Sequence, residues 1–195
     1  TPPQTISSHL WLCGAAKDNV GNAGFSSPVE FKIDKTSPIV TVTGAPASWQ
    51  NTDSTASVSC TDADSGCDTT TYKLKTYTSN PGTCSTTYAD YTLSSPQTIS
   101  SHLWVCSAAK DNVGNAGFST PVEFKVDKTS PIVSVTGAPV SWQNTDATAN
   151  ISCSDALPGC DPATYKLKTY TSNPGTCSTN YADYTLTSPQ TISSY

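Results

Sequence analysis

The sequence predicts an all-β protein made of tandem antiparallel β-sandwiches, with about 93 residues in each repeat and disulfides within it. Short segments alternate apolar and polar residues, and no segment sustains the 3.6-residue period of an amphipathic helix. Residues typical of turns separate these segments. A shift of 93 residues aligns residues 3–102 with residues 96–195 without a gap, and only 17 of the 100 pairs differ. This self-similarity indicates repeated domains.

The first two strand candidates of a repeat are Pro38–Gly44 and Thr55–Cys60. In Pro38–Gly44, β-branched residues alternate with others, and the turn-forming stretch APASWQNTD follows. In Thr55–Cys60, the apolar side chains share one face because they occupy every second position. Both segments therefore have the pattern of half-buried strands.

Four further candidates complete the repeat. Thr71–Thr78 and Ser101–Ala109 show the same alternation, and Tyr88–Leu93 is a short candidate between them. In Pro121–Asp127, every second residue is apolar and is expected to point inward. Six or seven short strands with turns between them, in about 93 residues, are typical of an antiparallel β-sandwich.

Domain boundaries are expected at the stretch DKTSP, which occurs at Asp34–Pro38 and again at Asp127–Pro131. Proline and charge interrupt the strand pattern there. The chain is thereby divided into residues 1–36, the last third of one domain, residues 37–129, a complete domain, and residues 130–195, the first two-thirds of another.

The composition excludes several classes of function. The chain has 10 Lys plus Arg against 15 Asp plus Glu and a net charge of −5, so no basic patch indicates nucleic-acid binding. No apolar run approaches the 18 or so residues of a membrane span. No signal peptide is visible, and the sequence contains no Met. We therefore expect a processed product or a segment of a longer protein.

The eight cysteines follow the same 93-residue period, with four in each full repeat. They form no CxxC pair, and the two histidines, His9 and His102, occupy a single repeat position, which disfavours zinc. Disulfides in an oxidising, extracellular or cell-surface setting are the favoured interpretation. The repeat relates Cys60, Cys67 and Cys84 to Cys153, Cys160 and Cys177, and Cys13 to Cys106.

Three stretches carry a resemblance to a known family. They are KTSPIVTVTGAPASWQNTD, SCTDADSGC, and AAKDNVGNAG ahead of a last strand that ends in DKT. Together they resemble the bacterial immunoglobulin-like (Big-type) tandem repeats of secreted and surface proteins, and the resemblance covers the whole chain. It implies immunoglobulin-like β-sandwiches in a large extracellular protein, with no enzyme activity and no cofactor.

Two disulfide pairings are compatible with the spacing. An antibody-like pairing joins Cys60 to Cys106 and Cys67 to Cys84. The alternative joins Cys60 to Cys67 around the loop TDADSG, which we call the clip, and Cys84 to Cys106, with Cys153–Cys160 as the second clip. The alternative is favoured because a six-residue, glycine-containing loop readily brings its ends together. The role is structural in both cases.

The clip is also a candidate metal site, since Asp62, Asp64 and Asp68 gather there. However, Asp64 is replaced by Leu157 in the next repeat, so the fold cannot require this ligand set. No metal ligand is predicted in the clip.

The turn Lys110–Asn115 is present in both copies and offers oxygens from Asp111, Asn112 and Asn115. A hairpin turn is the favoured interpretation, because Asp, Asn and Gly are typical of tight turns. Calcium binding there, or at Asp127 in the linker, remains the alternative.

No catalytic residue is predicted. A histidine recurs once per repeat and is replaced by Tyr195 at its third occurrence, and a lone sandwich seldom offers the cleft that paired carboxylates need. Trp49 and Trp142 are candidate sugar-stacking platforms, but plugs of the core or of the junction are favoured. The glycosylation sequon at Asn150 is interpreted as chance, because the other repeat has Ser57 there.

The expected function is structural: a repeat of an extracellular prokaryotic fibre, stalk or surface filament, whose partners are neighbouring repeats or copies of itself. The alternative is an adhesin module that binds a surface glycan or a host or cell partner. A third class is an accessory domain of a secreted hydrolase.

The two incomplete pieces are complementary, because residues 130–195 supply early strands and residues 1–36 supply late ones. Either the sequence is a segment of a continuous array, which needs fewer assumptions, or separate subunits complete each other by strand complementation. On the favoured pairing, Cys13 and Cys177 lack partners, and we expect them to bond between copies.

Overall fold

The computed structural model describes residues 3–193 of the chain. Its regular structure consists of strands and three single-turn 3-10 segments, so the all-β prediction is confirmed. The chain divides into two compact units, Thr1–Lys128 (unit 1) and Thr129–Tyr195 (unit 2). Among the described residues, no helix has the length and apolar character needed to cross a bilayer.

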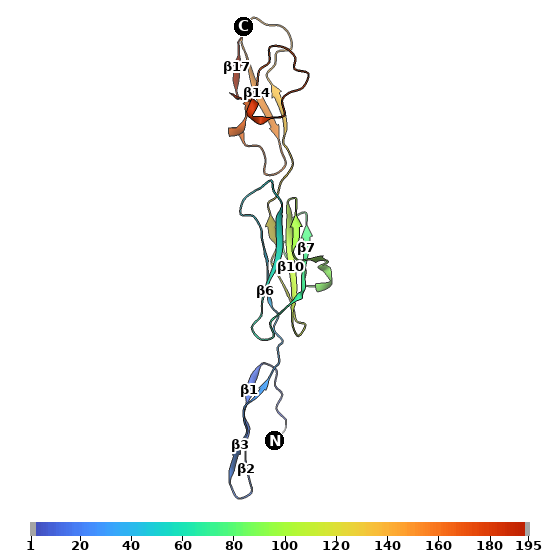
Figure 1. Cartoon of the computed structure of the whole chain (residues 1–195), viewed down its shortest axis with the longest axis vertical. Helices are drawn as coiled ribbons and strands as arrows, with labels where there is room; N and C mark the ends of the chain where they lie inside the picture. The colour runs from blue at the N-terminus through green and yellow to red at the C-terminus, as the bar shows by residue number, and fades with distance from the viewer. Residues whose placement is uncertain (1–2, 194–195) are drawn as a thin grey trace. The chain divides into compact units, whose positions relative to one another are not determined.

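Unit 1 contains one complete repeat with two antiparallel sheets, in which Figure 1 labels β6, β7 and β10. The first sheet has the order β5-β6-β9, and the second has the order β11-β10-β7-β8, with β12 also paired to β10. The strands are β5 Ile39–Thr43, β6 Ser54–Thr61, β7 Cys67–Tyr77, β8 Leu93–Ser94, β9 Gln97–Ile99, β10 Leu103–Asp111, β11 Ala116–Phe118 and β12 Val122–Phe124.

The two sheets of the repeat share one hydrophobic core. Val40 of β5 and Val58 of β6 pack in the same buried cluster as Leu74 of β7, Val105 of β10 and Phe124 of β12. These residues fall at alternate positions of their strands, as the sequence pattern predicts, because successive side chains of a strand point to opposite faces.

Strand β10 is buried on both faces. Val105 and Ala109 face the main core, whereas Cys106 and Ala108 belong to a second buried cluster around Tyr91. The longest pairing of the repeat joins β10 to β7, from Trp104↔Tyr77 to Asp111↔Cys67, with a bulge between Ala108 and Lys110. The second cluster explains why β10 reads as a nearly continuous apolar run.

The expectation of a strand over Tyr88–Leu93 is wrong. Tyr88–Asp90 is a 3-10 turn, and strand β8 begins only at Leu93. The hydroxyl of Tyr88 donates to the carbonyl of Thr71, and the hydroxyl of Tyr91 donates to that of Ser85. These contacts fold the segment back over the sheet instead of extending it.

The N-terminal part of unit 1 forms two small antiparallel ladders. Strand β1 (Leu10–Leu12) pairs with β4 (Val29–Phe31), and β2 (Ala15–Lys17) pairs with β3 (Ala23–Phe25). Their registers equal those of β10 with β12 and of β10 with β11, displaced by 93 residues. The segment therefore has the local pairing of the last third of a repeat.

Unit 2 has the first sheet of a repeat but little of the second. Strands β13 (Ile132–Thr136), β14 (Ala147–Ser154) and β17 (Gln190–Ile192) form one sheet in that order. Strands β15 (Lys166–Leu167) and β16 (Leu186–Thr187) form a two-stranded ladder. Two 3-10 turns, Pro162–Thr164 and Tyr181–Asp183, each precede one strand of this ladder in the sequence.

Candidate functional site

Three disulfides join Cys60 to Cys67, Cys84 to Cys106 and Cys153 to Cys160, with Cα separations of 6.2, 5.8 and 6.2 Å. This is the clip pairing and not the antibody-like one. The two faces of β10 explain the choice, because Cys106 points into the second cluster beside Cys84, whereas Cys60 packs against the main core. Gly66, at φ +74°, supplies the tight turn that closes the clip.

The two remaining cysteines, Cys13 and Cys177, are free and exposed. Their counterparts at the 93-residue period, Cys106 and Cys84, are bonded to each other in the complete repeat. Each free cysteine is thus in the place of one half of a disulfide that the complete repeat contains.

Unit 2 carries an exposed apolar surface beside Cys177. Apolar and aromatic side chains from β13, β14, β15 and the loops that follow line a groove of about 820 Å3. Val133 is 57% exposed and Val135 is 61% exposed, whereas Val40, the counterpart of Val133, is 4% exposed. We call this surface the open face; it comprises Val133, Val135, Ile151, Leu167, Tyr170, Cys177 and Tyr184, of which Leu167 is buried and Ile151 and Tyr184 are half-buried.

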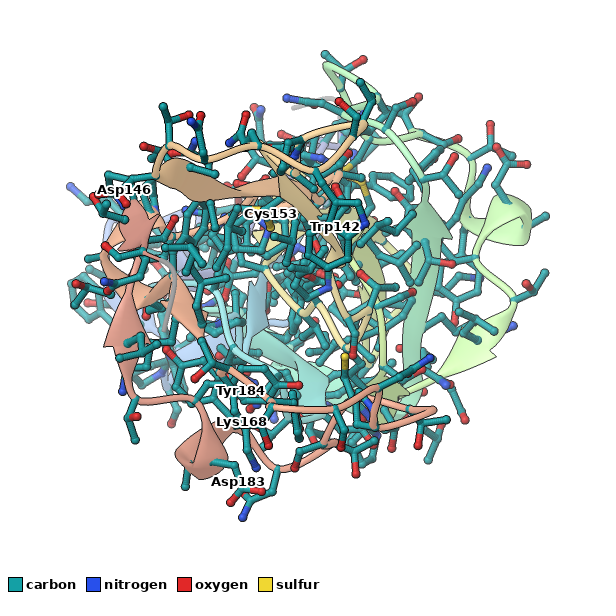
Figure 2. The ribbon with its side chains drawn as sticks, turned by 90° about the horizontal axis from the view of Figure 1, so that it is seen from above. Trp142, Asp146, Cys153, Lys168, Asp183 and Tyr184 are labelled. Carbon is teal, nitrogen blue, oxygen red and sulfur yellow. A yellow bond between two sulfur atoms is a disulfide. The ribbon has the colours of Figure 1, made fainter. Side chains whose placement is uncertain are left out.

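Charged groups flank the open face. Lys168 Nζ lies 3.3 Å from Asp183 Oδ2, and Figure 2 shows these two side chains near Tyr184. Lys168 also lies over the Tyr170 ring, 5.2 Å from its centroid. Burial raises the pKa of the Tyr184 hydroxyl, which donates a hydrogen bond to the carbonyl of Ser178 at 2.7 Å. The open face can therefore bind an apolar segment, with charged side chains at its edge.

A second candidate site is an acidic cluster in unit 1. Asp34 from the linker, Asp62 from the clip and Asp111 at the end of β10 each have a carboxylate oxygen within 4.8 Å of the others. Oxygen ligands of this kind suit hard cations such as Ca²⁺. From the sequence, Asp62 and Asp111 are candidates at two separate places, and Asp34 is expected only as part of the linker.

Protein donors already occupy the oxygens of the acidic cluster. Asp62 Oδ1 accepts from the backbone N–H groups of Ser65 and Gly66 at 3.0 and 2.9 Å. Hydrogen bonding from Ser65, and then from Thr36, holds the pKa of Asp34 well below its ordinary value. Asp34 is thus ionised, and both carboxylates serve as acceptors that order the clip and the linker.

Asp111 has the same role in the turn Lys110–Asn115. Although burial raises the pKa of Asp111, hydrogen bonds from the side chain and backbone of Asn115 and from the backbone of Val113 hold it below its ordinary value. The Asn112 amide donates to the carbonyl of Ser65 at 2.7 Å. These contacts fit the turn interpretation, since both asparagine amides act as donors within the fold.

The other candidate carboxylates lie outside the acidic cluster. Asp64 Oδ1 is 3.4 Å from Nδ1 of His9, and Asp68 accepts hydrogen bonds from Thr70. The backbone N–H of Asp127 donates to the carbonyl of Gln50. One signal could have identified the cluster from the sequence: its members recur at the period, as Asp34 and Asp127, Asp62 and Asp155, and Asp18 and Asp111.

The tryptophan candidates differ in their surroundings. Trp49 is half-buried, and its ring centroid lies 5.0 Å from that of His102. His102 in turn hydrogen-bonds Glu123 at 3.0 Å. Trp142, the counterpart of Trp49, is fully exposed. Asn150, the sequon residue, is exposed on β14.

No protein-family model matches the chain, and none of the curated proteins matches it either. The interpretation of function therefore depends on the open face, the two free cysteines and the repeat itself.

Proposed function

We propose that the chain is a structural repeat of an extracellular prokaryotic fibre or surface filament, built from immunoglobulin-like domains of the bacterial Big type joined head to tail. In this proposal residues 37–129 form one complete domain, and residues 1–36 and 130–195 are parts of the adjoining domains. Neither a catalytic residue nor a cofactor enters the proposal.

A single observation carries this proposal. Residues 10–31 and unit 2 expose the two complementary halves of a core that the complete repeat buries within itself. Exposed apolar surface of this extent is costly in water and is typical of an interaction site. Two unlike surfaces on one chain give head-to-tail association, which continues as an open series unless the rotation between copies closes a ring.

The disulfides support the extracellular part of the proposal. Three of them close loops within unit 1 and unit 2, and bonds of this kind persist in oxidising compartments. They also stabilise small sandwiches whose cores are short of apolar surface, which suits a repeat exposed to the medium.

A glycan-binding adhesin is the second candidate, and the full exposure of Trp142 favours it. Exposed tryptophan rings are common stacking surfaces for sugars. In the complete repeat, however, the equivalent Trp49 packs against His102, so the same ring becomes partly covered once a domain is whole. We therefore favour a structural role for both rings.

The test uses the 195-residue chain at increasing concentration under oxidising conditions. Electron microscopy should show linear particles of constant width whose length grows with concentration. In parallel, the wild type and the Trp49→Ala and Trp142→Ala variants are applied to a glycan array. A monomer at every concentration, together with glycan binding that either substitution abolishes, would replace the filament with the adhesin.

A further inference from the structure

We propose that residues 10–31 of a second copy fill the open face of unit 2, and that Cys13 of the second copy forms a disulfide with Cys177 of the first. This proposal rests on the filament function above and specifies its joint. The acceptor surface, the inserted segment, the register between them and one close backbone approach support this joint.

The acceptor surface lacks the neighbours that its counterpart has in the complete repeat. There, Leu74 belongs to the 11-residue strand β7, which pairs along most of its length with β10. Its counterpart Leu167 belongs to β15, which has two residues and pairs only with β16. Residues 165–170 have the same sequence as residues 72–77. What differs between the two copies is the neighbouring strand and the residues just before this stretch, where Pro162 replaces Thr69 and begins a 3-10 turn.

The proposed insert has the sequence and the pairing of that missing neighbour. Residues 10–31 differ from residues 103–124 only at Leu12, Gly14 and Ser27. Their two ladders already have the register of β10 with β12 and with β11. The insert is thus largely preformed, which lowers the entropic cost of ordering it on binding.

The same side chains that the complete repeat buries are exposed in the insert. Cys106, Ala108 and Ala109 are completely buried in β10. Cys13, Ala15 and Ala16, their counterparts, are exposed. Phe25, the counterpart of the half-buried Phe118, is 79% exposed. The insert therefore presents apolar groups that match the open face.

The pairing of β10 with β7 gives the expected register of the joint. Trp104↔Tyr77 corresponds to Trp11 opposite Tyr170, and Cys106↔Lys75 corresponds to Cys13 opposite Lys168. Pro162, which has no N–H to donate, corresponds to Thr69. It falls within the bulge, where β7 and β10 exchange no regular pairs.

One glycine makes the joint sensitive to a single methyl group. A Cβ on Gly117 would lie 2.1 Å from the carbonyl oxygen of Pro38 and 2.9 Å from Val40 Cγ2. Gly24 is the counterpart of Gly117, and Pro131 and Val133 are the counterparts of the two obstacles. In the structure a Cβ on Gly24 would meet only the carbonyl oxygen of Ala16, at 4.0 Å. A side chain at Gly24 is therefore harmless in the separate chain and obstructive in the joint.

The covalent step needs an oxidant, and oxidised glutathione or another small disulfide is sufficient. The thiolate of one cysteine attacks the disulfide and releases one glutathione thiol, which leaves a mixed disulfide on the protein. The other cysteine then attacks the mixed disulfide, forms the Cys13–Cys177 bond and releases a second thiol. Two protein thiols are oxidised, and one disulfide of the reagent is reduced to two thiols.

The first experiment exposes the full chain to oxidised glutathione and separates the products on denaturing gels without reductant. The wild type should give a ladder in multiples of 20.4 kDa, and peptide mapping should recover the Cys13–Cys177 bond. The Cys13→Ser and Cys177→Ser variants should each remain single chains. Their mixture should give a dimer and nothing larger, because only one pair of partners exists.

The second experiment tests the fit without the disulfide. In a chain that carries Cys13→Ser and Cys177→Ser and keeps its three other disulfides, sedimentation velocity should show association that Gly24→Val reduces at least tenfold. The matched control is Gly14→Ser, which reproduces Ser107 of the complete repeat and should leave association unchanged. Equal thermal midpoints for the two variants as isolated chains would establish that folding is unaffected.

Several results would overturn the proposal. They are a Cys13–Cys177 bond within one chain, bonds between like cysteines, and association that Gly24→Val leaves intact. Filaments that form under oxidising conditions while Cys13 and Cys177 stay unbonded to each other, and that Gly24→Val leaves intact, would retain the proposed function and reject this joint. An absence of any association would reject both.

Discussion

The two disulfides of the complete repeat should differ in their contribution to stability, because they close loops of different length. Cys60–Cys67 spans 7 residues, and Cys84–Cys106 spans 22. The loss of loop-closure entropy in the unfolded chain gives about 2.4 kcal/mol for the shorter loop and about 3.4 kcal/mol for the longer one. Replacing Cys84 and Cys106 together by alanine should therefore cost about 1 kcal/mol more than replacing Cys60 and Cys67 together.

Urea unfolding followed by tryptophan fluorescence measures this difference. Trp11 and Trp142 are exposed in the folded chain, so the half-buried Trp49 and Trp104 dominate the change in signal. All variants are made in a chain that also carries Cys13→Ser and Cys177→Ser, which prevents bonds between chains. The slope of the unfolding free energy against urea should rise in both variants, because the unfolded chain becomes less compact. Equal losses, or a greater loss for the shorter loop, would refute the loop-closure argument.

Three further predictions concern packing, metal and pH. Gly117→Ala should lower the free energy of unfolding by about 1–3 kcal/mol or more, because the new Cβ would overlap the carbonyl oxygen of Pro38. A thermal midpoint equal to that of the wild type would contradict the close approach. Adding EGTA should leave the thermal midpoint unchanged because protein donors already occupy the carboxylate oxygens of the acidic cluster, whereas a drop that Ca²⁺ reverses would identify a metal site. The pKa values of Asp34 and Asp111 are lowered in the folded state. Their contribution to stability is therefore complete at a pH above their unfolded pKa of about 3.8, and it is lost as the pH falls through their folded pKa values. Asp111→Asn should therefore flatten the acid limb of a plot of midpoint against pH, and an unchanged limb would show that this carboxylate contributes nothing.

Much of the fold could be predicted because its pattern is local. In Thr55–Cys60, alternation alone indicates which side chains are buried, and β6 follows it. The clip is equally local, since the short spacing of Cys60 and Cys67 favours the pairing that the structure contains. Structure that forms among residues close in the sequence can therefore be predicted from composition and spacing.

The features that the sequence analysis missed depend on distant partners. Tyr88 is held by the carbonyl of Thr71, and Asp34 meets Asp62 and Asp111 only after the sheets have assembled. The clearest case is the stretch YKLKTY, which lies within the long strand β7 in one repeat but contributes only two strand residues in the other. The six residues are the same in both copies, so the difference comes from their surroundings: the neighbouring strand, and Pro162 in place of Thr69 just before the stretch.

The disulfides of the complete repeat also determine how far it can lengthen under tension applied through its two ends. When force unfolds such a domain, the backbone between Cys60 and Cys67 and between Cys84 and Cys106 bears no load, since the force passes through the disulfide bonds. These enclosed stretches span 7 and 22 residues, and fully extended they would add roughly 90 Å to the length of the ruptured domain. In an oxidising medium the disulfides therefore limit how far each unfolded repeat can extend under load. A reducing agent would remove this limit and make the repeat more extensible.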